Sequence, residues 1–306
     1  MISAIALLVV GACFLIRYSN LKAYSERNSE KIILTQAETY NAPDEAFFEN
    51  PKDVEKEIIV PKYVDPLSRV TSRAYLIGDI ETGKIYLNKN SDVQLPVASM
   101  SKLVTAIIAT KTLKEDTMIQ ISSSTQMIPP DSSGVRVGEQ FSLKEILYPM
   151  LLNSSNIAAE AIASTSGRIN FLELMSSLSW EIGMPQAYFA DPSGVDPHNQ
   201  ASSKDIFALA QYLYKSRPDI LEITRTKSIS VASTTDHDAH DFMSIHPFIN
   251  DERFIGGKTG RTKEAGETML TILNIDGKAT VFVIMGSNIG MRAIDTKILI
   301  DEYLKM

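Results

Sequence analysis

The sequence predicts an α+β domain in which both ends of the folded part contribute strands to one antiparallel sheet, with a cluster of helices inserted between them. The order of the periodic segments carries this prediction. Strand-like segments near residues 73–87 precede segments with helical spacing that continue to residue 215, and strand-like segments return between residues 226 and 287. With 306 residues, 44% hydrophobic and 22% charged, the composition is that of an ordinary globular protein with one large domain or two small ones.

The N-terminal residues contain an apolar segment. Ile2–Ile16 is fifteen uncharged, mostly apolar residues. As a helix it would be about 22 Å long against a hydrocarbon core of about 30 Å, a length typical of a signal-peptide core. No Ala-x-Ala cleavage site follows, so we expect residues 1–22 to be an uncleaved membrane anchor. A cleaved signal segment and a buried core helix are the alternatives.

Residues 23–65 are expected to form a linker. They are polar and charged, contain Pro43, Pro51 and Pro61, and keep no helical or strand period. As a coil they would reach about 35–40 Å. We therefore expect the folded domain to occupy residues 66–306.

Charge and cysteine content exclude several classes of function. The net charge is −7 and no basic block is present, so nucleic acid is not expected as a partner. The single cysteine, Cys13, lies in the apolar N-terminal segment. A disulfide framework or a cysteine-based zinc site within one chain is therefore excluded.

The first part of the folded domain predicts a hairpin followed by helices. Residues 73–79 and 85–87 are strand-like, with turn residues between them. The elements expected next are a helix from Ser99, a short strand at 117–122, and helices at 143–152, 157–163, 171–182 and 205–215. Ser142, and Ser202 or Ser203, stand where helix caps are expected.

The C-terminal part returns to strands. Strand-like segments cover residues 226–231, 254–258, 268–275 and 280–287. The turn residues 274–277 separate the last two, which are therefore expected to form a hairpin. A helix at 294–303 is expected to end the domain.

The stretch Pro96–Ile108, PVASMSKLVTAII, places Ser99 three residues before Lys102 at the start of a predicted helix. Residues i and i+3 share a helix face, so the two side chains can meet. A neutral amine can take the proton of a serine hydroxyl and make it a nucleophile, and the first turn of a helix favours an oxyanion. The tetrad alone is a weak signal, because a capping serine and a solvated lysine are common.

Two further motifs add weight to the first. Ser154-Ser155-Asn156 lies where a helix is expected to begin, and Lys258-Thr259-Gly260 ends a predicted strand, where glycine permits close approach of the backbone. The set S-x-x-K, S-x-N and K-T-G is the signature of penicillin-binding proteins and serine β-lactamases.

From about Tyr75 to its end, the chain resembles the low-molecular-weight penicillin-binding proteins, the D-alanyl-D-alanine carboxypeptidase family of serine peptidases. The resemblance extends beyond the three motifs. It includes the segments ASMSKL, VGEQFSLKEILYPMLLNSSNIAAEAIA, FADPSGVD and GGKTGRTKEAGETML. It implies a β-lactamase/transpeptidase-like fold and a peptidase that acts on peptidoglycan stem peptides outside the cytoplasmic membrane. β-Lactams would be covalent inhibitors, and neither a cofactor nor a metal is implied.

The resemblance also implies a role for each motif residue. Ser99 would be the acylated nucleophile, Lys102 its base, and Ser154 a relay for protons. The residues that would bind the substrate are Asn156, Lys258, Thr259, Gly260 and Arg261. The backbone N–H groups of Ser99 and Arg261 would form the oxyanion hole.

Other functions of the same fold are the alternatives. They are a D-alanyl-D-alanine endopeptidase that cuts cross-links and a β-lactamase, and a non-catalytic wall-binding protein is the less favoured interpretation. A common class of β-lactamase carries a Glu-x-x-x-Asn loop between the second and third motifs, and no glutamate between Asn156 and Lys258 fits it. The sequence departs from the family at Ser155, which usually is glycine and is expected to narrow the site.

Weaker candidates lie outside the motifs. His237, His240 and His246 stand among aspartates and could hold a metal, but a solvated loop is the favoured interpretation. Trp180 is expected in the core with the Met175/Leu178/Ile182 stripe. Ser133 could line the entrance of the site or serve a turn.

The N-terminal segment and the implied wall substrate lead to a prediction about topology. Arg17 and Lys22 follow the apolar segment and no charge precedes it, which by the positive-inside rule opposes export of the domain. We nevertheless expect the domain on the outer side of the membrane, where its substrate would be. Protease added to intact spheroplasts should therefore digest the domain, and full protection would show that either the topology or the substrate is wrong.

Overall fold

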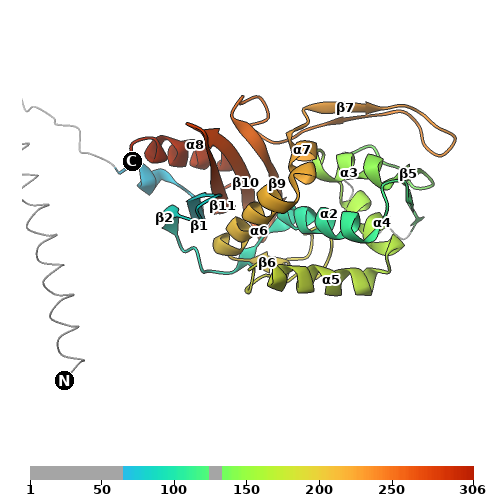
Figure 1. Cartoon of the computed structure of the whole chain (residues 1–306), viewed down its shortest axis with the longest axis horizontal. Coiled ribbons are helices and arrows are strands. Elements are labelled where there is room, and N and C mark those ends of the chain that lie inside the picture. Colours follow the sequence, from blue (N-terminus) through green and yellow to red (C-terminus); the bar gives the residue numbers. More distant parts are fainter. Residues whose placement is uncertain (1–64, 124–132) are drawn as a thin grey trace, which may run out of the picture. The chain divides into compact units, whose positions relative to one another are not determined.

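The computed structural model describes residues 65–123 and 133–306, so the expected anchor and most of the expected linker lie outside the described residues. The core of the fold is a five-stranded sheet in the order β2-β1-β11-β10-β9 (Figure 1). In the part of the chain that the structure describes, no helix is long and apolar enough to cross a membrane.

The sheet joins the two ends of the domain, as predicted. Its strands are β1 (Ala74–Asp79), β2 (Ile85–Lys89), β9 (Phe254–Thr262), β10 (Gly266–Ile275) and β11 (Lys278–Ser287). All neighbours are antiparallel, and β1 pairs with β11 so that Leu76 faces Val283. The turn between β10 and β11 contains Asp276 and Gly277, both with positive φ, as a tight hairpin requires.

Side chains alternate between the two faces of the sheet and are buried on both. On one face Tyr75, Ile77 and Phe282 belong to a cluster with Leu299 of α8 (Arg292–Tyr303). On the other face Leu76 and its sheet neighbours belong to the larger cluster shared with the helices. The sheet is therefore the middle layer, and each large side chain buried against it contributes about 1.5–3 kcal/mol to stability.

The helical cluster surrounds one central helix. Its members are α2 (Ser101–Thr112), α3 (Leu143–Leu151), α4 (Asn156–Thr165), α5 (Arg168–Glu181), α6 (Ser203–Ser216) and α7 (Pro218–Arg225). Residues 101–109 of α2 are buried without interruption, and α3, α4, α5 and α7 all contact this helix (Figure 1). A helix buried all round holds its side chains in fixed positions.

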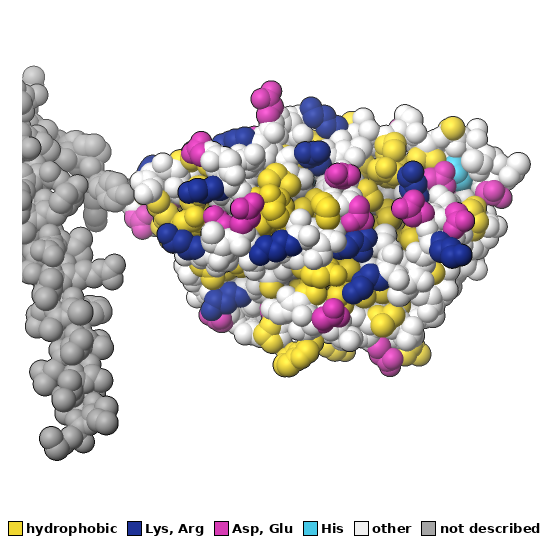
Figure 2. Space-filling view, in the orientation of Figure 1, with side chains coloured by type: hydrophobic (Ala, Val, Ile, Leu, Met, Phe, Trp, Pro, Cys, Tyr) yellow, Lys and Arg dark blue, Asp and Glu magenta, His cyan; other side chains and the backbone are white. Residues whose placement is uncertain are grey.

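Short elements complete the fold. They are the 3₁₀ helices η1 (Pro66–Arg69) and η2 (Ala98–Met100), and the paired strands β3 (Leu95–Pro96) with β6 (Gln200–Ala201), β4 (Met118–Gln120) with β5 (Gln140–Ser142), and β7 (Ser228–Val231) with β8 (His240–Met243). The surface in Figure 2 carries Lys/Arg and Asp/Glu side chains interspersed with each other.

The predicted caps are present, whereas one helix was not predicted. Ser142 caps α3 and Ser202 caps α6, each in a reciprocal capping box. Helix α7 lies where only a change towards strands was expected. It has eight residues and begins at Pro218, and a segment this short gives too few repeats of a helical period to be recognised.

The expectation that the three histidines lie in a solvated loop is wrong. The exposed fractions of His237, His240 and His246 are 6%, 9% and 5%. His240 lies on β8, its Nε2 is 2.9 Å from a carboxylate oxygen of Glu139, and its ring stacks on Phe242. A histidine can be buried when it stacks on an aromatic ring and has a carboxylate partner. The polar composition of the segment predicts exposure because it does not reveal these partners. Among the described residues, no group of three or more potential ligands could hold a metal.

The expected position of Trp180 is also wrong. Met175 and Leu178 are buried and Ile182 is half-buried, but Trp180 is 74% exposed. Two residues after Leu178, its position on α5 is turned about 200° from the buried stripe. The apolar spacing therefore predicts the helix and its stripe correctly but does not include this residue.

His246 is a buried neutral histidine beneath β9. Its Nε2 donates to the Leu270 carbonyl at 3.1 Å, and its Nδ1 accepts from the Phe248 N–H at 3.3 Å. Burial, with the positive charges of Lys258 and Arg292, lowers the pKa of His246 from 6.5 to about 3. The ring therefore stays neutral at every pH at which the native protein is expected to work.

This low pKa predicts an acid-sensitive contribution to stability. Above pH 6.5 His246 is neutral in both states, whereas below it only the unfolded chain takes up the proton. Between pH 7 and pH 5 this group should lower the free energy of unfolding by about 2 kcal/mol, because its pKa falls to about 3 on folding. Urea unfolding at the two pH values should show a smaller acid loss for His246→Gln than for the wild type. An equal loss in both proteins would contradict the assignment.

Candidate active site

Ser99 lies in a strained turn directly before the central helix. A helix was expected to begin at Ser99, but α2 begins at Ser101 and Ser99 belongs to η2. Ala98 has φ +49°, a left-handed conformation that costs a non-glycine residue about 1–2 kcal/mol. Two hydroxyls hold this turn, since Ser101 Oγ donates to the Ala98 carbonyl at 2.9 Å and Thr268 Oγ1 donates to the Val97 carbonyl at 3.0 Å.

Lys102, on the first turn of α2, brings three segments together. Its side chain is fully buried. Its Nζ lies 2.8 Å from Ser99 Oγ, 2.8 Å from Asn156 Oδ1 and 2.6 Å from the Ser193 carbonyl oxygen. The predicted contact between the serine and the lysine is therefore present, and one turn of α2, the start of α4 and the loop before β6 meet at one amine.

The loop that supplies the Ser193 carbonyl is built around Asp191. One oxygen of the Asp191 carboxylate accepts the N–H groups of Ser193 and Gly194, both at 2.6 Å, and the other accepts that of Asp196 at 2.5 Å. Asn199 ties this loop to α2, because its Nδ2 donates to Ser101 Oγ at 3.0 Å and to the Asp191 carbonyl at 2.7 Å. No sequence motif indicates this contact, since a backbone carbonyl leaves no residue-type signal.

A second pair of amine and hydroxyl lies beside the first. Lys258 is 1% exposed, and its Nζ is 2.9 Å from Ser154 Oγ and 2.9 Å from the Thr259 carbonyl oxygen. Ser154 has φ +65°, which turns the chain at the entry to α4. Two hydroxyl–amine pairs of this kind can exchange protons with a bound molecule placed between them.

Ser155, which is expected to narrow the site, also serves the start of a helix. It is buried and caps α4, with its Oγ accepting the Ala158 N–H at 3.1 Å. Ser133 Oγ donates to the same oxygen at 3.1 Å. The residue that departs from the family pattern therefore serves the start of the helix, and Ser133 supports it.

Strand β9 passes directly against the Ser99 turn. A Cβ at Gly260 would lie 2.8 Å from the Ser99 nitrogen and 2.5 Å from Thr268 Oγ1, so only glycine fits. The strand continues to Thr262 rather than ending at the K-T-G motif as predicted. Thr259 is buried and Arg261 is exposed. Within the described residues, no hydrogen bond joins either side chain to the other motif residues of the site.

The site concentrates positive charge in a buried place. Burial, and then the charges of Lys102 and Arg292, lower the pKa of Lys258 well below its ordinary value of 10.5. Arg292 Nη1 donates to the Gly260 carbonyl at 3.1 Å. Burial also lowers the pKa of Arg292, against the opposing effect of Glu267. No sequence motif indicates Arg292, which reaches the site from α8, yet the arrangement suits a negatively charged ligand.

The chain is similar to known proteins over most of its length. The family model described as D-alanyl-D-alanine carboxypeptidase matches residues 61–288. The D-alanyl-D-alanine endopeptidase of Pseudomonas aeruginosa is 29% identical over 235 residues, which cover 74% of each chain. The D-alanyl-D-alanine carboxypeptidase DacF of Bacillus subtilis is 25% identical over 240 residues, 74% of this chain and 60% of that protein.

Solved structures share the fold. The D-alanyl-D-alanine carboxypeptidase from Mycobacterium tuberculosis has a TM-score of 0.70 at 19% identity, covering 77% of this chain and 92% of that one. Penicillin-binding protein D2 from Listeria monocytogenes, in its ampicillin-bound form, has a TM-score of 0.64 at 23% identity, covering 76% and 96%. The β-lactamase/transpeptidase-like α+β fold expected from the sequence is thereby confirmed.

The contact between the Asp191 loop and the Ser99 turn leads to a stability prediction. A Cβ at Gly194 would lie 1.9 Å from the Ala98 carbonyl oxygen, and Gly194 has φ +83°. Gly277 has nearly the same φ, +79°, with nothing within 4 Å, and is a matched control. Gly277→Ala should cost about 1–2 kcal/mol of unfolding free energy, and Gly194→Ala at least about 2 kcal/mol more because of the clash. Equal losses in urea unfolding would show that the Asp191 loop does not press on this turn.

Proposed function

Since the chain belongs to the D-alanyl-D-alanine carboxypeptidase family, we propose that it is a serine peptidase that hydrolyses the bond after the acyl D-alanine of peptidoglycan stem peptides. The observation that carries the proposal is the 2.8 Å contact between Ser99 Oγ and the buried Lys102 Nζ. We also propose that the catalytic domain is residues 66–306, that it lies outside the cytoplasmic membrane, and that residues 1–22 anchor it.

Acylation begins at Ser99. Its Oγ attacks the carbonyl carbon of the acyl D-alanine while neutral Lys102 takes the hydroxyl proton. The N–H groups of Ser99 and Arg261 stabilise the oxyanion, and Asn156 holds the substrate amide and orients Lys102. When the C–N bond breaks, the proton that Lys102 took from Ser99 passes through Ser154 to the leaving amine, so Lys102 is neutral again and an ester remains on Ser99. Water then attacks the ester while Lys102 takes a proton from it, and Lys102 returns this proton to Ser99 Oγ as the C–O bond breaks.

The carboxylate of the leaving residue is bound at β9. Lys258 and Thr259 receive it, and the glycine at 260 lets this strand lie beside the nucleophile. Burial lowers the pKa of Lys258 and so disfavours its charged form. A carboxylate bound beside this amine stabilises the charged form, because it supplies a nearby negative charge. A substrate with this carboxylate should therefore be strongly preferred over its amide.

Endopeptidase cleavage of cross-links is the second candidate. In that reaction the leaving amine belongs to a second stem peptide instead of free D-alanine, and the acyl half and Ser99 chemistry are the same. The observation that favours it is the endopeptidase of Pseudomonas aeruginosa, which is 29% identical and is matched over 74% of its length. The matched carboxypeptidase is 25% identical and is matched over 60% of its length.

The nucleophile and the leaving group can be tested together. Wild-type protein should bind labelled penicillin covalently and hydrolyse purified muropeptides, and Ser99→Ala should lose both activities, by about 10³-fold or more. Mass spectrometry identifies the leaving group, since release of D-alanine from a monomeric pentapeptide indicates the carboxypeptidase and conversion of dimers to monomers indicates the endopeptidase.

The control for this test is Ser176→Ala, which removes an exposed serine hydroxyl on α5 and should leave labelling unchanged. Labelling that persists in Ser99→Ala would refute the nucleophile. Without a placed glutamate to activate water, the penicillin adduct should also persist after excess drug is removed. Loss of the adduct within seconds, with hydrolysed drug accumulating, would favour a β-lactamase instead.

A further inference from the structure

A cavity lies at the end of the sheet where β2 begins and β10 turns into β11. It has a volume of about 340 Å³ and is lined by residues at the start of β2, the β10–β11 turn and the end of α8. None of its lining residues belongs to β9, to the Ser99 turn or to the helical cluster, so this cavity is distinct from the Ser99 site. A volume of this size suits one or two sugar rings or a short peptide.

Two tyrosines form the base of the cavity. The rings of Tyr86 and Tyr303 meet edge to face with centroids 5.1 Å apart, and both pack on the apolar cluster beneath α8. Tyr86 Oη donates to Asp79 at 3.4 Å, while the Asp79 carboxylate also accepts the N–H groups of Glu81 and Thr82. The Asp79 carboxylate is thus hydrogen-bonded within its own turn. Packing fixes the orientation of the two tyrosines, whose ring faces and hydroxyl groups line the cavity.

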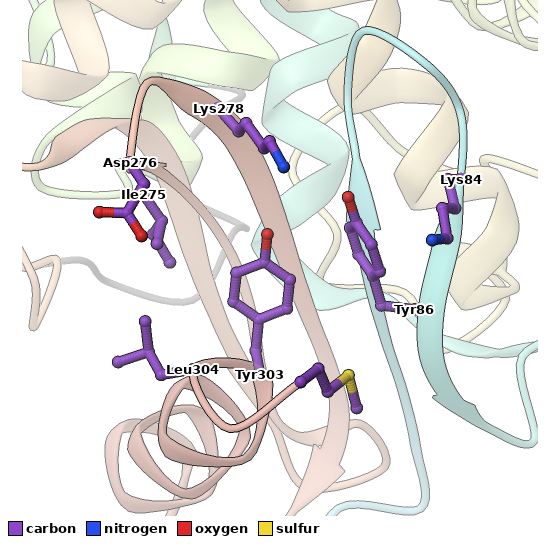
Figure 3. A pocket seen from close by; sticks show the side chains of 8 residues that line it. Lys84, Tyr86, Ile275, Asp276, Lys278, Tyr303 and Leu304 are labelled. Atoms are coloured by element: carbon purple, nitrogen blue, oxygen red, sulfur yellow. The ribbon is translucent and has the colours of Figure 1, made fainter.

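Two lysines supply positive charge to the same cavity. Lys84 Nζ lies 4.9 Å from the centroid of the Tyr86 ring. Figure 3 shows Lys278 Nζ and the Tyr303 hydroxyl directed towards the Tyr86 hydroxyl, whereas the Asp276 carboxylate points away from them. In the described part of the chain neither lysine forms an ion pair with a carboxylate. Two ammonium groups in a cavity lined by tyrosines suit an anion that also has an apolar or sugar surface.

We propose that this cavity is a second, non-catalytic binding site for an acidic muropeptide, with its carboxylates at Lys84 and Lys278 and its sugar on the two tyrosines. The faces of the two tyrosine rings suit a sugar ring, which a bare phosphate lacks, so the lining favours the muropeptide over a phosphate headgroup. The inference deepens the proposed function and rests on it, because it gives a domain that cleaves peptidoglycan a second site that binds peptidoglycan.

The test is binding of a soluble disaccharide-tripeptide, which lacks the D-alanine residues that Ser99 would act on. Isothermal titration calorimetry of the full chain in neutral detergent should give a Kd that Lys84→Ala/Lys278→Ala weakens by about tenfold or more, since two charge-assisted contacts are lost. The matched control, Lys114→Ala/Lys227→Ala, removes the same charge at two other exposed lysines and should keep the wild-type Kd. Circular dichroism should show both variants folded.

The outcomes separate the alternatives. Equal weakening in both double variants, or no binding by the wild type, would overturn the site. Binding of inorganic phosphate or glycerol phosphate that depends on Lys84 and Lys278, without muropeptide binding, would overturn the muropeptide in favour of a phosphate ligand. Release of D-alanine from a short peptide is measured on the same proteins and should be unchanged in both double variants. Its absence in the wild type, with muropeptide binding retained, would count against the proposed reaction and leave the second site standing.

Discussion

The burial of two lysine amines is the constraint on which the rest of the site depends. Lys102 and Lys258 are at most 1% exposed. Removing an ammonium group from water costs several kcal/mol even after the surroundings relax, so each amine requires polar partners. The partners come from far apart in the chain: Asn156 and the Ser193 carbonyl for Lys102, and Ser154 for Lys258. The contacts that satisfy the amines also define the distances between the groups that would react.

The fold can meet this constraint because the sheet closes over the helical cluster from both ends of the domain. Pairing with β10 places β9 beside the η2 turn, and Thr268 of β10 donates to the turn itself at Val97. The Asp191 loop approaches from the other direction. Glycine at 194 and at 260 is what allows both segments to come so close, since a Cβ at either would overlap the backbone of the turn. Packing around Ser99 and the chemistry proposed for Ser99 therefore depend on the same contacts.

Sequence reasoning was strongest where a property is local or repeated. The capping serine Ser142, the hairpin at Asp276–Gly277 and the helical spacing after Ser99 each follow from neighbouring residues. Three distant motifs also predict side chains that the fold brings together. The Ser193 carbonyl and Arg292 could not be found this way, because a backbone atom has no residue type and a single arginine on α8 carries no motif. Burial of the histidines was not predicted for a related reason, since Phe141, which stacks on His237, and Glu139, which contacts His240, lie far from them in the sequence.

The electrostatics of the site couple substrate binding to proton transfer. Over the whole chain the net charge is −7, yet Lys102, Lys258 and Arg292 gather where β9 meets the helices. Before a ligand arrives, burial and the neighbouring cations hold the pKa of Lys258 well below 10.5, which favours its neutral form. A carboxylate bound beside Lys258 would reverse part of that effect, because its negative charge raises the pKa of the amine again. In the proposed reaction the leaving amine receives its proton through Ser154, which Lys258 contacts, so the residue that would bind the substrate carboxylate also lies beside the path of that proton.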